Sequence, residues 1–403
     1  MLRYWLWLSA LPGLNNEARL TLLNHFGTPD KIFYAGKEEL SQVRDLHSYQ
    51  VSRVMNHDLS AADAIWEDCC RLDIGILTIQ DAAYPTRLRN IFNPPCLLYI
   101  KGSLPVMDGE AAIAVVGTRS CTPYGLSCAN RISREMAACG AVVVTGLAKG
   151  VDAAAARGAL QGGGIVVGVV GNGLDVHYPW ESRDLYEETA SAGALLSEYP
   201  PGAEPERRNF PERNRIMSGL SAGVLVVEAP ERSGALITAG LALDQGREVF
   251  AVPGPIDVPT SRGCNHLIRE GAGLVMNGWD VLREYVDRYP EKLRYVETNP
   301  WTAPDSPQKK RPEKTESDGS PEEPEAPAPE KVLPVVHPSE LDADQTAILR
   351  VLQTESPTQV DDLIQAAGIP AQQVLSALTM LEINGMVWQH SGKRYTRAVT
   401  LEE

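Results

Sequence analysis

The sequence contains no long apolar run, no paired cysteines and no recognisable catalytic signature. No stretch of about 18 apolar residues occurs, so we expect no membrane-spanning helix. The cysteines, 7 in number, are scattered and include no C-x-x-C pair, which argues against disulfides and structural zinc and suits a reducing cytoplasm. The 7 histidines are isolated, and a nucleophile elbow, an H-E-x-x-H helix and a Walker A loop are all missing. We therefore expect a cytoplasmic protein with no cofactor and no metal site, and no catalytic set of residues emerges from the sequence.

The overall charge is acidic, with a formal net charge of −15 over 403 residues. Such a balance normally counts against nucleic-acid binding. Binding, however, depends on a local patch rather than on the charge of the whole chain. Much of the acid lies away from the densest run of arginine, and some of it follows Asn299. A basic site therefore remains compatible with the composition.

The central part of the chain alternates apolar runs with helix-length segments. Apolar strands separated by helices predict a doubly wound, mostly parallel sheet of the Rossmann-like α/β class over residues 76–290. Ligands on such sheets bind at the carboxyl ends of the strands. The strand-like runs are Ala111–Val116, Ala141–Thr145, Ile165–Val170, Ala194–Ser197, Val224–Val227, Val249–Val252 and Leu274–Met276.

Smaller segments flank this sheet. Residues 1–75 read as a small helical bundle of helix-hairpin-helix or sterile-alpha-motif type, for which docking is the favoured role and contact with DNA backbone the alternative. Residues 74–104 are expected to form a bridge with an edge strand after Pro94-Pro95. Residues 299–340 are rich in Pro, Glu and Lys, and we expect them to form a disordered linker.

Residues 341–398 are predicted to form a winged helix, with three helices followed by two short strands around Ser391-Gly392. From Val351 to Gly392 this domain contains no Lys or Arg. Because a duplex reader needs cations for phosphate, we expect a protein-contact or auxiliary role instead.

Three glycine-rich turns follow strands of the predicted sheet. Gly117-Thr118-Arg119-Ser120 can offer backbone N–H groups and a planar charged fork to a phosphate. Thr145–Asp152 and Gly171–Asp175 repeat the theme. The alternative is that these are ordinary strand-to-helix turns, with an Arg–carboxylate pair at the first and the acids capping helices.

The most informative stretch carries Arg207, Arg208, Arg213 and Arg215 around Phe210. Arginines favour planar recognition of phosphates and bases, and a basic track with a stacking ring suits an extended polyanion. Interspersed glutamates leave a salt-bridged surface as the alternative. The Ser233-Gly234-Ala235 turn then opens a helix, whose N-terminus also favours anions.

Seven ordered motifs between about Tyr84 and Met276 resemble the DNA-processing protein DprA (Smf) family of bacterial natural transformation. They read VVGTRSCTPYG, VTGLAKGVDAAAARGAL, GVVGNGLDVHYP, LLSEYPPG, NFPERNRIMSGLS, LVVEAPERSGALITAGLALDQGREVFAVPG and SRGCNHLIREGA.

The resemblance implies a non-enzymatic homodimer that binds incoming single-stranded DNA without strong sequence preference, protects it, and helps to load the recombinase RecA. The DNA-binding residues that we infer from the motifs and the resemblance together are Gly117, Thr118, Arg119, Arg207, Phe210, Arg213, Asn214, Arg215, Ser233 and Gly234.

Three positions depart from the family pattern. Ala156 replaces a usual histidine, Ser182 a usual asparagine, and Ala235 the second serine of an S-G-S turn. Two other functions remain open beside the mediator. One is a phosphoribohydrolase-like enzyme acting on nucleotides, although its P-G-G-x-G-T-x-x-E signature is missing. The other is a transcription factor that uses the winged helix, which the lack of basic residues disfavours.

Overall fold

The computed structural model describes residues 1–296, 335–336, 341–354, 358–384, 386–390 and 394–401. The chain divides into two units, Met1–Ser306 and Pro307–Glu403, and each is considered by itself. The linker predicted over residues 299–340 lies outside the described residues, apart from Val335 and Val336, which form strand β10 (Val335–Val336).

The first unit is built on a nine-stranded sheet with the order β1-β2-β6-β5-β4-β3-β7-β8-β9. From β6 to β9 all neighbouring strands are parallel. The strands are β1 (Gly75–Thr78), β2 (Leu97–Gly102), β3 (Ala112–Val116), β4 (Val142–Thr145), β5 (Val166–Val170), β6 (Ala194–Ser197), β7 (Gly223–Val226), β8 (Glu248–Ala251) and β9 (Gly273–Leu274).

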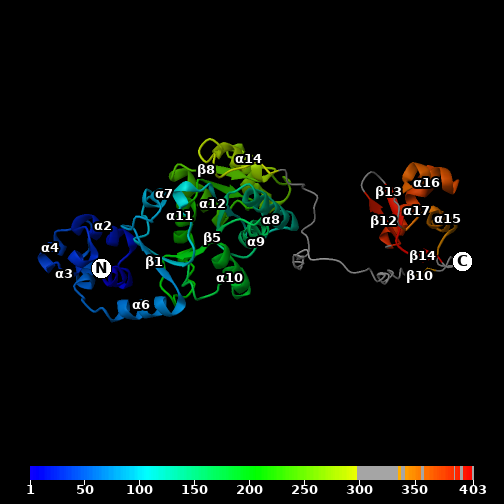
Figure 1. Cartoon of the computed structure of the whole chain (residues 1–403). Coiled ribbons are helices and arrows are strands. Elements are labelled where there is room, and N and C mark those ends of the chain that lie inside the picture. The colour runs from blue at the N-terminus through cyan, green and yellow to red at the C-terminus, as the bar shows by residue number, and fades with distance from the viewer. Residues whose placement is uncertain (297–334, 337–340, 355–357, 385, 391–393, 402–403) are drawn as a thin grey trace, which may run out of the picture. The chain divides into compact units, whose positions relative to one another are not determined.

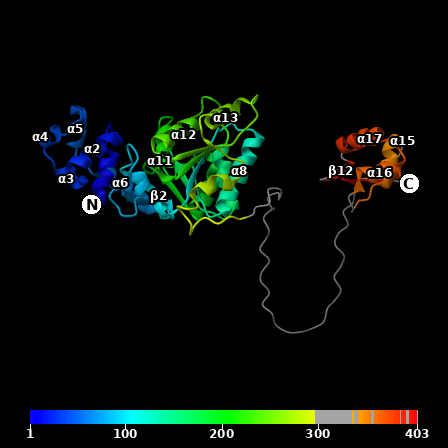
Figure 2. The same cartoon turned by 90° about the horizontal axis from the view of Figure 1, so that it is seen from above.

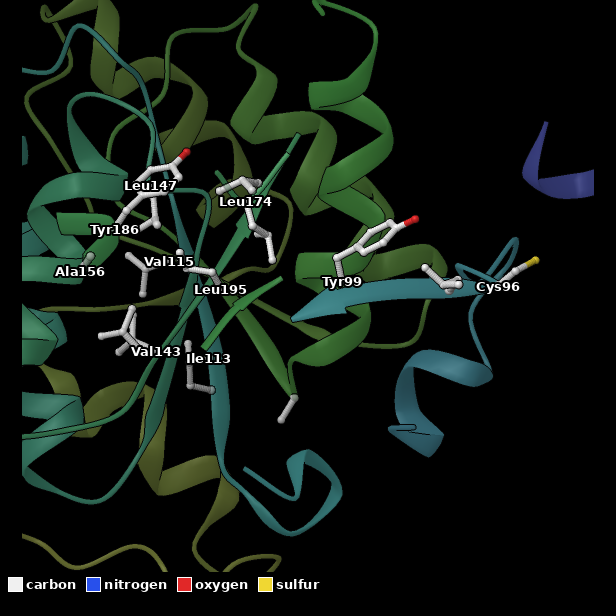
Figure 3. Packing of buried hydrophobic residues seen from close by; sticks show 14 of the residues in the cluster. Cys96, Tyr99, Ile113, Val115, Val143, Leu147, Ala156, Leu174, Tyr186 and Leu195 are labelled. Carbon is white, nitrogen blue, oxygen red and sulfur yellow. The ribbon is translucent and has the colours of Figure 1, made fainter. Parts of the chain in front are cut away.

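Helices cover both faces of this sheet. Alternate residues of each strand point to opposite faces, so Ile113 and Val115 join one apolar cluster while Ala112 and Ala114 join the other. Figure 3 shows part of the first cluster, including Val115 and Val143 on the strands. The first face is covered by α8 (Pro123–Ala138), α9 (Val151–Gln161), α10 (Arg183–Ala192) and α14 (Gly278–Leu282). The second is covered by α7 (Thr86–Arg89), α11 (Asn209–Leu220), α12 (Gly234–Asp244) and α13 (Arg262–Arg269). The predicted doubly wound, mostly parallel α/β fold is confirmed.

A strand does follow Pro94-Pro95, but it is not the edge strand that we expected. That strand, β2, pairs antiparallel with β6 on one side and antiparallel with β1 on the other. The edge of the sheet is therefore β1, which the sequence did not reveal because Gly75–Thr78 is short and lacks a turn signal.

The N-terminal helices pack against this edge of the sheet. Figures 1 and 2 both show them at the end of the unit where β1 and β2 lie. Asn16 donates to the carbonyl of Pro94 at 2.8 Å and accepts from the N–H of Cys96 at 3.2 Å. One apolar cluster runs without interruption from Trp5 in these helices to Tyr99 in β2. The helices are α1 (Leu2–Ala10), α2 (Asn16–Phe26), α3 (Pro29–Tyr34), α4 (Lys37–Ser41), α5 (Ser48–Val54) and α6 (Ser60–Leu72).

The second unit has its own small core, centred on Leu349, Leu363 and Leu381. Helices α15 (Ala343–Val351), α16 (Val360–Ala367) and α17 (Ala371–Ile383) are followed by the hairpin of β12 (Val387–His390) and β13 (Arg394–Arg397). The predicted winged-helix arrangement is confirmed. Two short elements were not foreseen, namely β11 (Thr358–Gln359), which pairs with β13, and the ladder between β10 and β14 (Thr400–Leu401).

Candidate nucleic-acid interface

An open groove lies at the carboxyl ends of the central strands, with an empty volume of about 930 Å³. Its walls come from the turn after β3, from the start of α11 and from the start of α12. Eight of the ten residues predicted to bind DNA line it: Gly117, Thr118, Arg119, Phe210, Arg213, Asn214, Ser233 and Gly234. The structure therefore brings together segments that are more than a hundred positions apart in the sequence.

The centre of the groove is a stacked pair, Arg119 over Phe210. The guanidinium carbon of Arg119 lies 5.0 Å from the centroid of the Phe210 ring. Arg119 is exposed, and Phe210 is partly exposed. Asn209 sets the position of the ring, because its buried side chain donates to the carbonyl of Gly171 at 2.9 Å and so fixes the start of α11. The pair offers a cation and an aromatic face at one point of the surface.

A second, smaller hollow adjoins the groove beyond Phe210, with an empty volume of about 400 Å³. The two hollows share Arg119, Ala148 and Phe210. Tyr178 extends the aromatic surface here, since its ring centroid lies 5.5 Å from that of Phe210. Lys149 stands at the rim of the hollow and forms an ion pair with Glu181, at 2.9 Å.

Three backbone amides in and after the turn that follows β3 are already bonded within the protein. The N–H of Thr118 donates to the carbonyl of Glu228 at 2.7 Å, and that of Thr122 donates to the Glu228 carboxylate at 2.9 Å. The N–H of Ser120 donates to the Thr118 hydroxyl at 3.3 Å. These three amides already have partners and are not available to a ligand, whereas the exposed side chain of Arg119 is.

Two of the glycine-rich turns interlock beneath the groove. A side chain at Gly117 would clash with Val151, with a Cβ only 2.5 Å from the nearest methyl carbon. Gly150 has a φ of 82° and lies against the carbonyl of Thr118, at 2.5 Å from its would-be Cβ. Glycine is therefore required at both positions by close approach, as the packing interpretation of these turns expected.

The start of α12 forms the opposite wall. Ser233 caps the helix by accepting from the N–H of Ala235 at 3.3 Å, and Gly234 is exposed. Arg232 precedes the cap, is exposed and lines the groove. Within the described part of the chain, neither Arg232 nor Arg119 has an ion-pair partner. Two arginines without an ion pair therefore line the groove together with a helix N-terminus, which is a favourable place for anions.

The floor of the groove holds a buried charge system. Arg213 is only 4% exposed and donates to the carbonyl of Val169. Its guanidinium fits against Gly146, where any Cβ would collide with it. Burial raises the pKa of the neighbouring Asp152 to about 6, while Arg213 and backbone N–H groups oppose that rise. Burial also lowers the pKa of Arg213, and Asp152 counteracts this effect. Arg213 therefore contributes positive potential from below rather than an accessible contact.

The remaining two predicted residues lie outside the groove. Arg215 is 9% exposed and forms an ion pair with Glu198 at 2.8 Å, while its Nε donates to the carbonyl of Asn93 at 2.9 Å. Arg207 is exposed in the loop before α11 and lines neither hollow. For Arg215, the structure matches the salt-bridged alternative rather than phosphate recognition.

Comparison with known proteins agrees with these features. A family model described as DNA recombination-mediator protein A matches residues 75–286, and one described as DprA winged helix domain matches residues 321–393. The chain is 33% identical over 414 aligned residues to the Smf protein of Synechocystis sp., covering 98% of each. This chain belongs to the DprA (Smf) family. The resemblance seen in its motifs is thus confirmed.

Another DprA protein is similar to this chain in both sequence and structure. The DNA processing protein DprA of Streptococcus pneumoniae is 45% identical over 208 residues, which is 52% of this chain and 73% of that one. The X-ray structure of DprA from the same organism aligns with a TM-score of 0.63 and 36% identity, covering 70% of this chain and 98% of that one.

The three residues that depart from the DprA family pattern differ in their burial and in their distance from the groove surface. Ala156 is fully buried in α9 within the first apolar cluster (Figure 3), so the change there affects packing rather than the groove surface. Ser182 is 5% exposed and ends the 3₁₀ helix η2 (Trp180–Ser182). Ala235 lines the groove as the second residue of α12.

Sequence reasoning missed Arg232, Tyr178 and Lys149. Arg232 directly precedes the Ser233 cap, so its place beside a helix N-terminus could have been inferred. Tyr178 follows the turn after β5, and Lys149 lies inside the turn after β4, but their approach to Phe210 depends on tertiary packing. Among the described residues, no three His, Cys, Asp or Glu side chains form a metal-binding group, and no helix there is long and apolar enough to span a membrane.

Proposed function

We propose that this protein is a recombination mediator that binds single-stranded DNA in the groove between the turn after β3 and the start of α12. It binds without strong sequence preference, protects incoming DNA during natural transformation and helps RecA to load. It acts as a homodimer in the cytoplasm and catalyses no reaction of its own. The observation that carries the proposal is the exposed Arg119 stacked over Phe210, with Arg232 and the N-terminus of α12 opposite.

Each part of the groove suits one part of a single strand. Arg119 and Arg232 are free to meet phosphates, and Gly234 adds the positive end of a helix dipole. Phe210 and Tyr178 offer ring faces, which only unpaired bases can reach. Gly117, Thr118, Asn214 and Ser233 shape the walls. Arg213 supports the positive potential from the floor, and Arg215 and Arg207 act outside the groove.

Fluorescence anisotropy with labelled oligonucleotides across a salt series tests the proposal. We expect tighter binding of single strands than of duplex, with an affinity that falls as salt rises. Phe210→Ala should weaken single-strand binding by about 5- to 150-fold, as expected for the loss of one base–aromatic contact. Phe92→Ala is the matched control, because Phe92 is 84% exposed and lines neither groove nor adjoining hollow. Salt-independent binding, or equal binding by both variants, would overturn the proposal.

Separate assays test the finer parts. RecA-driven strand exchange should proceed faster on protein-coated single strands than on strands coated with the Phe210→Ala variant. A nuclease should digest a single strand more slowly when it is coated with the wild-type protein than when it is coated with the Phe210→Ala variant. Analytical ultracentrifugation should give the mass of two copies of the 43.8 kDa chain.

One observation favours the enzyme alternative. Asp152 lines the groove and burial raises its pKa to about 6, which would suit a general acid or base near neutral pH. A phosphoribohydrolase would release free base from nucleoside monophosphates. Chromatographic detection of free base that disappears in Asp152→Asn would support the enzyme, and its absence in the wild type would dismiss it.

A further inference from the structure

An exposed tryptophan stands beside the hollow that adjoins the groove. Trp180 begins the 3₁₀ helix η2 and is 77% exposed. The two residues before it, Tyr178 and Pro179, line the hollow. Tyr178 in turn lies against Phe210, with 5.5 Å between ring centroids. Trp180 therefore follows, two positions along the chain, an aromatic residue that contacts the centre of the groove.

The backbone around Trp180 is held on both sides. Glu181 forms an ion pair with Lys149 at 2.9 Å, which joins η2 to the turn after β4. The N–H of Ser182, a buried residue, donates to the carbonyl of Pro179 at 2.9 Å. The Tyr186 hydroxyl donates to the carbonyl of Tyr178 at 3.0 Å. An indole ring that is this exposed on a segment fixed by its neighbours contributes little to the packing of the unit.

The charges near Trp180 point to a base rather than to a phosphate. Lys149 is neutralised by Glu181, and Arg183 is neutralised by Glu187 at 3.2 Å. By contrast, Arg232 lines the groove alone, and Arg119 lies where the groove and the hollow meet. The η2 side of the site thus offers an aromatic face with paired cations, which suits stacking more than phosphate binding.

We propose that Trp180 is a further stacking site, which holds one base of a single strand that extends from the groove past Phe210 and Tyr178. The proposal rests on the proposed function, because it lengthens the same DNA site. The bound strand runs from the α12 wall, across Arg119 and Phe210, to η2. Tryptophan has the largest ring face of any side chain, and such stacking tolerates any base.

Anisotropy with oligothymidylates of increasing length tests this extension. Trp180→Ala should bind short oligomers as the wild type does, and long oligomers about 5- to 150-fold more weakly. The salt slope should not change, because no phosphate contact is lost. Trp180→Phe should recover most of the affinity. Trp66→Ala is the matched control, since Trp66 is 47% exposed on α6 and lines none of these hollows.

Intrinsic fluorescence gives a readout that a structural role would not produce. Single-stranded DNA should quench the wild-type emission, and the quench should shrink in Trp180→Ala but not in Trp66→Ala. Equal binding of long oligomers by wild type and Trp180→Ala, with Phe210→Ala still weakened, would overturn this proposal and leave the proposed function intact. A changed sedimentation coefficient without changed binding would also overturn it, since Trp180 would then contact protein. Failure of the wild type to bind any oligomer would instead refute the proposed function.

Discussion

Replacement of Arg119 by alanine should weaken DNA binding without changing the stability of the fold. Arg119 is exposed and, within the described residues, stacks on Phe210 without any ion pair, so Arg119→Ala should leave the free energy of unfolding within about 0.5 kcal/mol of the wild type. Binding of single-stranded DNA should fall because one charged contact is lost. A hydrogen bond to a charged group contributes about 1.5–3 kcal/mol. This corresponds to about 10- to 150-fold in affinity at low salt.

The salt dependence of DNA affinity distinguishes the charge of Arg119 from the planar shape of its guanidinium group. Each phosphate contact adds about 0.7 to the slope of log K against log salt for a single strand, so Arg119→Ala should flatten the slope by about that amount. Arg119→Lys keeps the charge but loses the planar face over Phe210. We therefore expect it to keep the slope and lose only part of the affinity.

Anisotropy titrations at four or more salt concentrations, run with the three proteins in parallel, measure both quantities. Denaturant unfolding of the same samples checks that stability is equal. If Arg119→Ala keeps the full slope and affinity, the reasoning about the groove is refuted. If the salt slope of Arg119→Lys is as flat as that of Arg119→Ala, a positive charge alone is not sufficient for the phosphate contact. The expectation that lysine preserves the slope is then wrong.

Two further predictions concern the buried charges. Arg215→Ala should lower the free energy of unfolding by about 3–5 kcal/mol, because the Glu198 side chain, only 10% exposed, loses its ion pair. Urea unfolding measures this, and a flattened salt slope with unchanged stability would contradict it. Burial raises the pKa of Asp152 to about 6, above its unfolded value of 3.8, so the folded state binds more protons between these values. The contribution of Asp152 to the free energy of unfolding is therefore greatest below pH about 4. It declines by about 3 kcal/mol as pH rises to about 6. Unfolding curves of wild type and Asp152→Asn should diverge across that window, whereas parallel curves would refute the assignment.

The sequence was sufficient for most of the sheet because parallel strands are buried on both faces. Runs such as Ala111–Val116 and Ile165–Val170 are continuously apolar, and each lies within one residue of an observed strand. The groove followed from the same pattern, because the turns after these strands must gather at one edge. This pattern places Arg119 at that edge, whereas Phe210, which lies in α11, was joined to it by the family resemblance.

The roles of the other arginines could not be read in this way. Arg213 and Arg215 lie in a helix that is buried from Arg213 to Leu220, and only the packing of α11 against the sheet reveals that burial. Likewise, Glu228 accepts from the N–H of Thr118 through its carbonyl and from the N–H of Thr122 through its carboxylate, although it lies about a hundred positions further along the chain. Local patterns indicate which groups can bind phosphate, whereas distant residues decide which of them are already engaged.

The shared apolar cluster of the N-terminal helices and the sheet has a consequence for dissecting the molecule. Gly75 looks like a natural start for an isolated sheet domain, since the last helix ends at Leu72 and β1 begins there. Removal of residues before it would strip the cover from Cys96 and Tyr99, which are 4% and 1% exposed in the intact chain. Such a fragment would present fresh apolar surface beside β1 and β2 and tend to aggregate. The smallest reagent for studying the groove is therefore the whole first unit, and a destabilising change in α1 should lower the fraction of molecules with a folded groove.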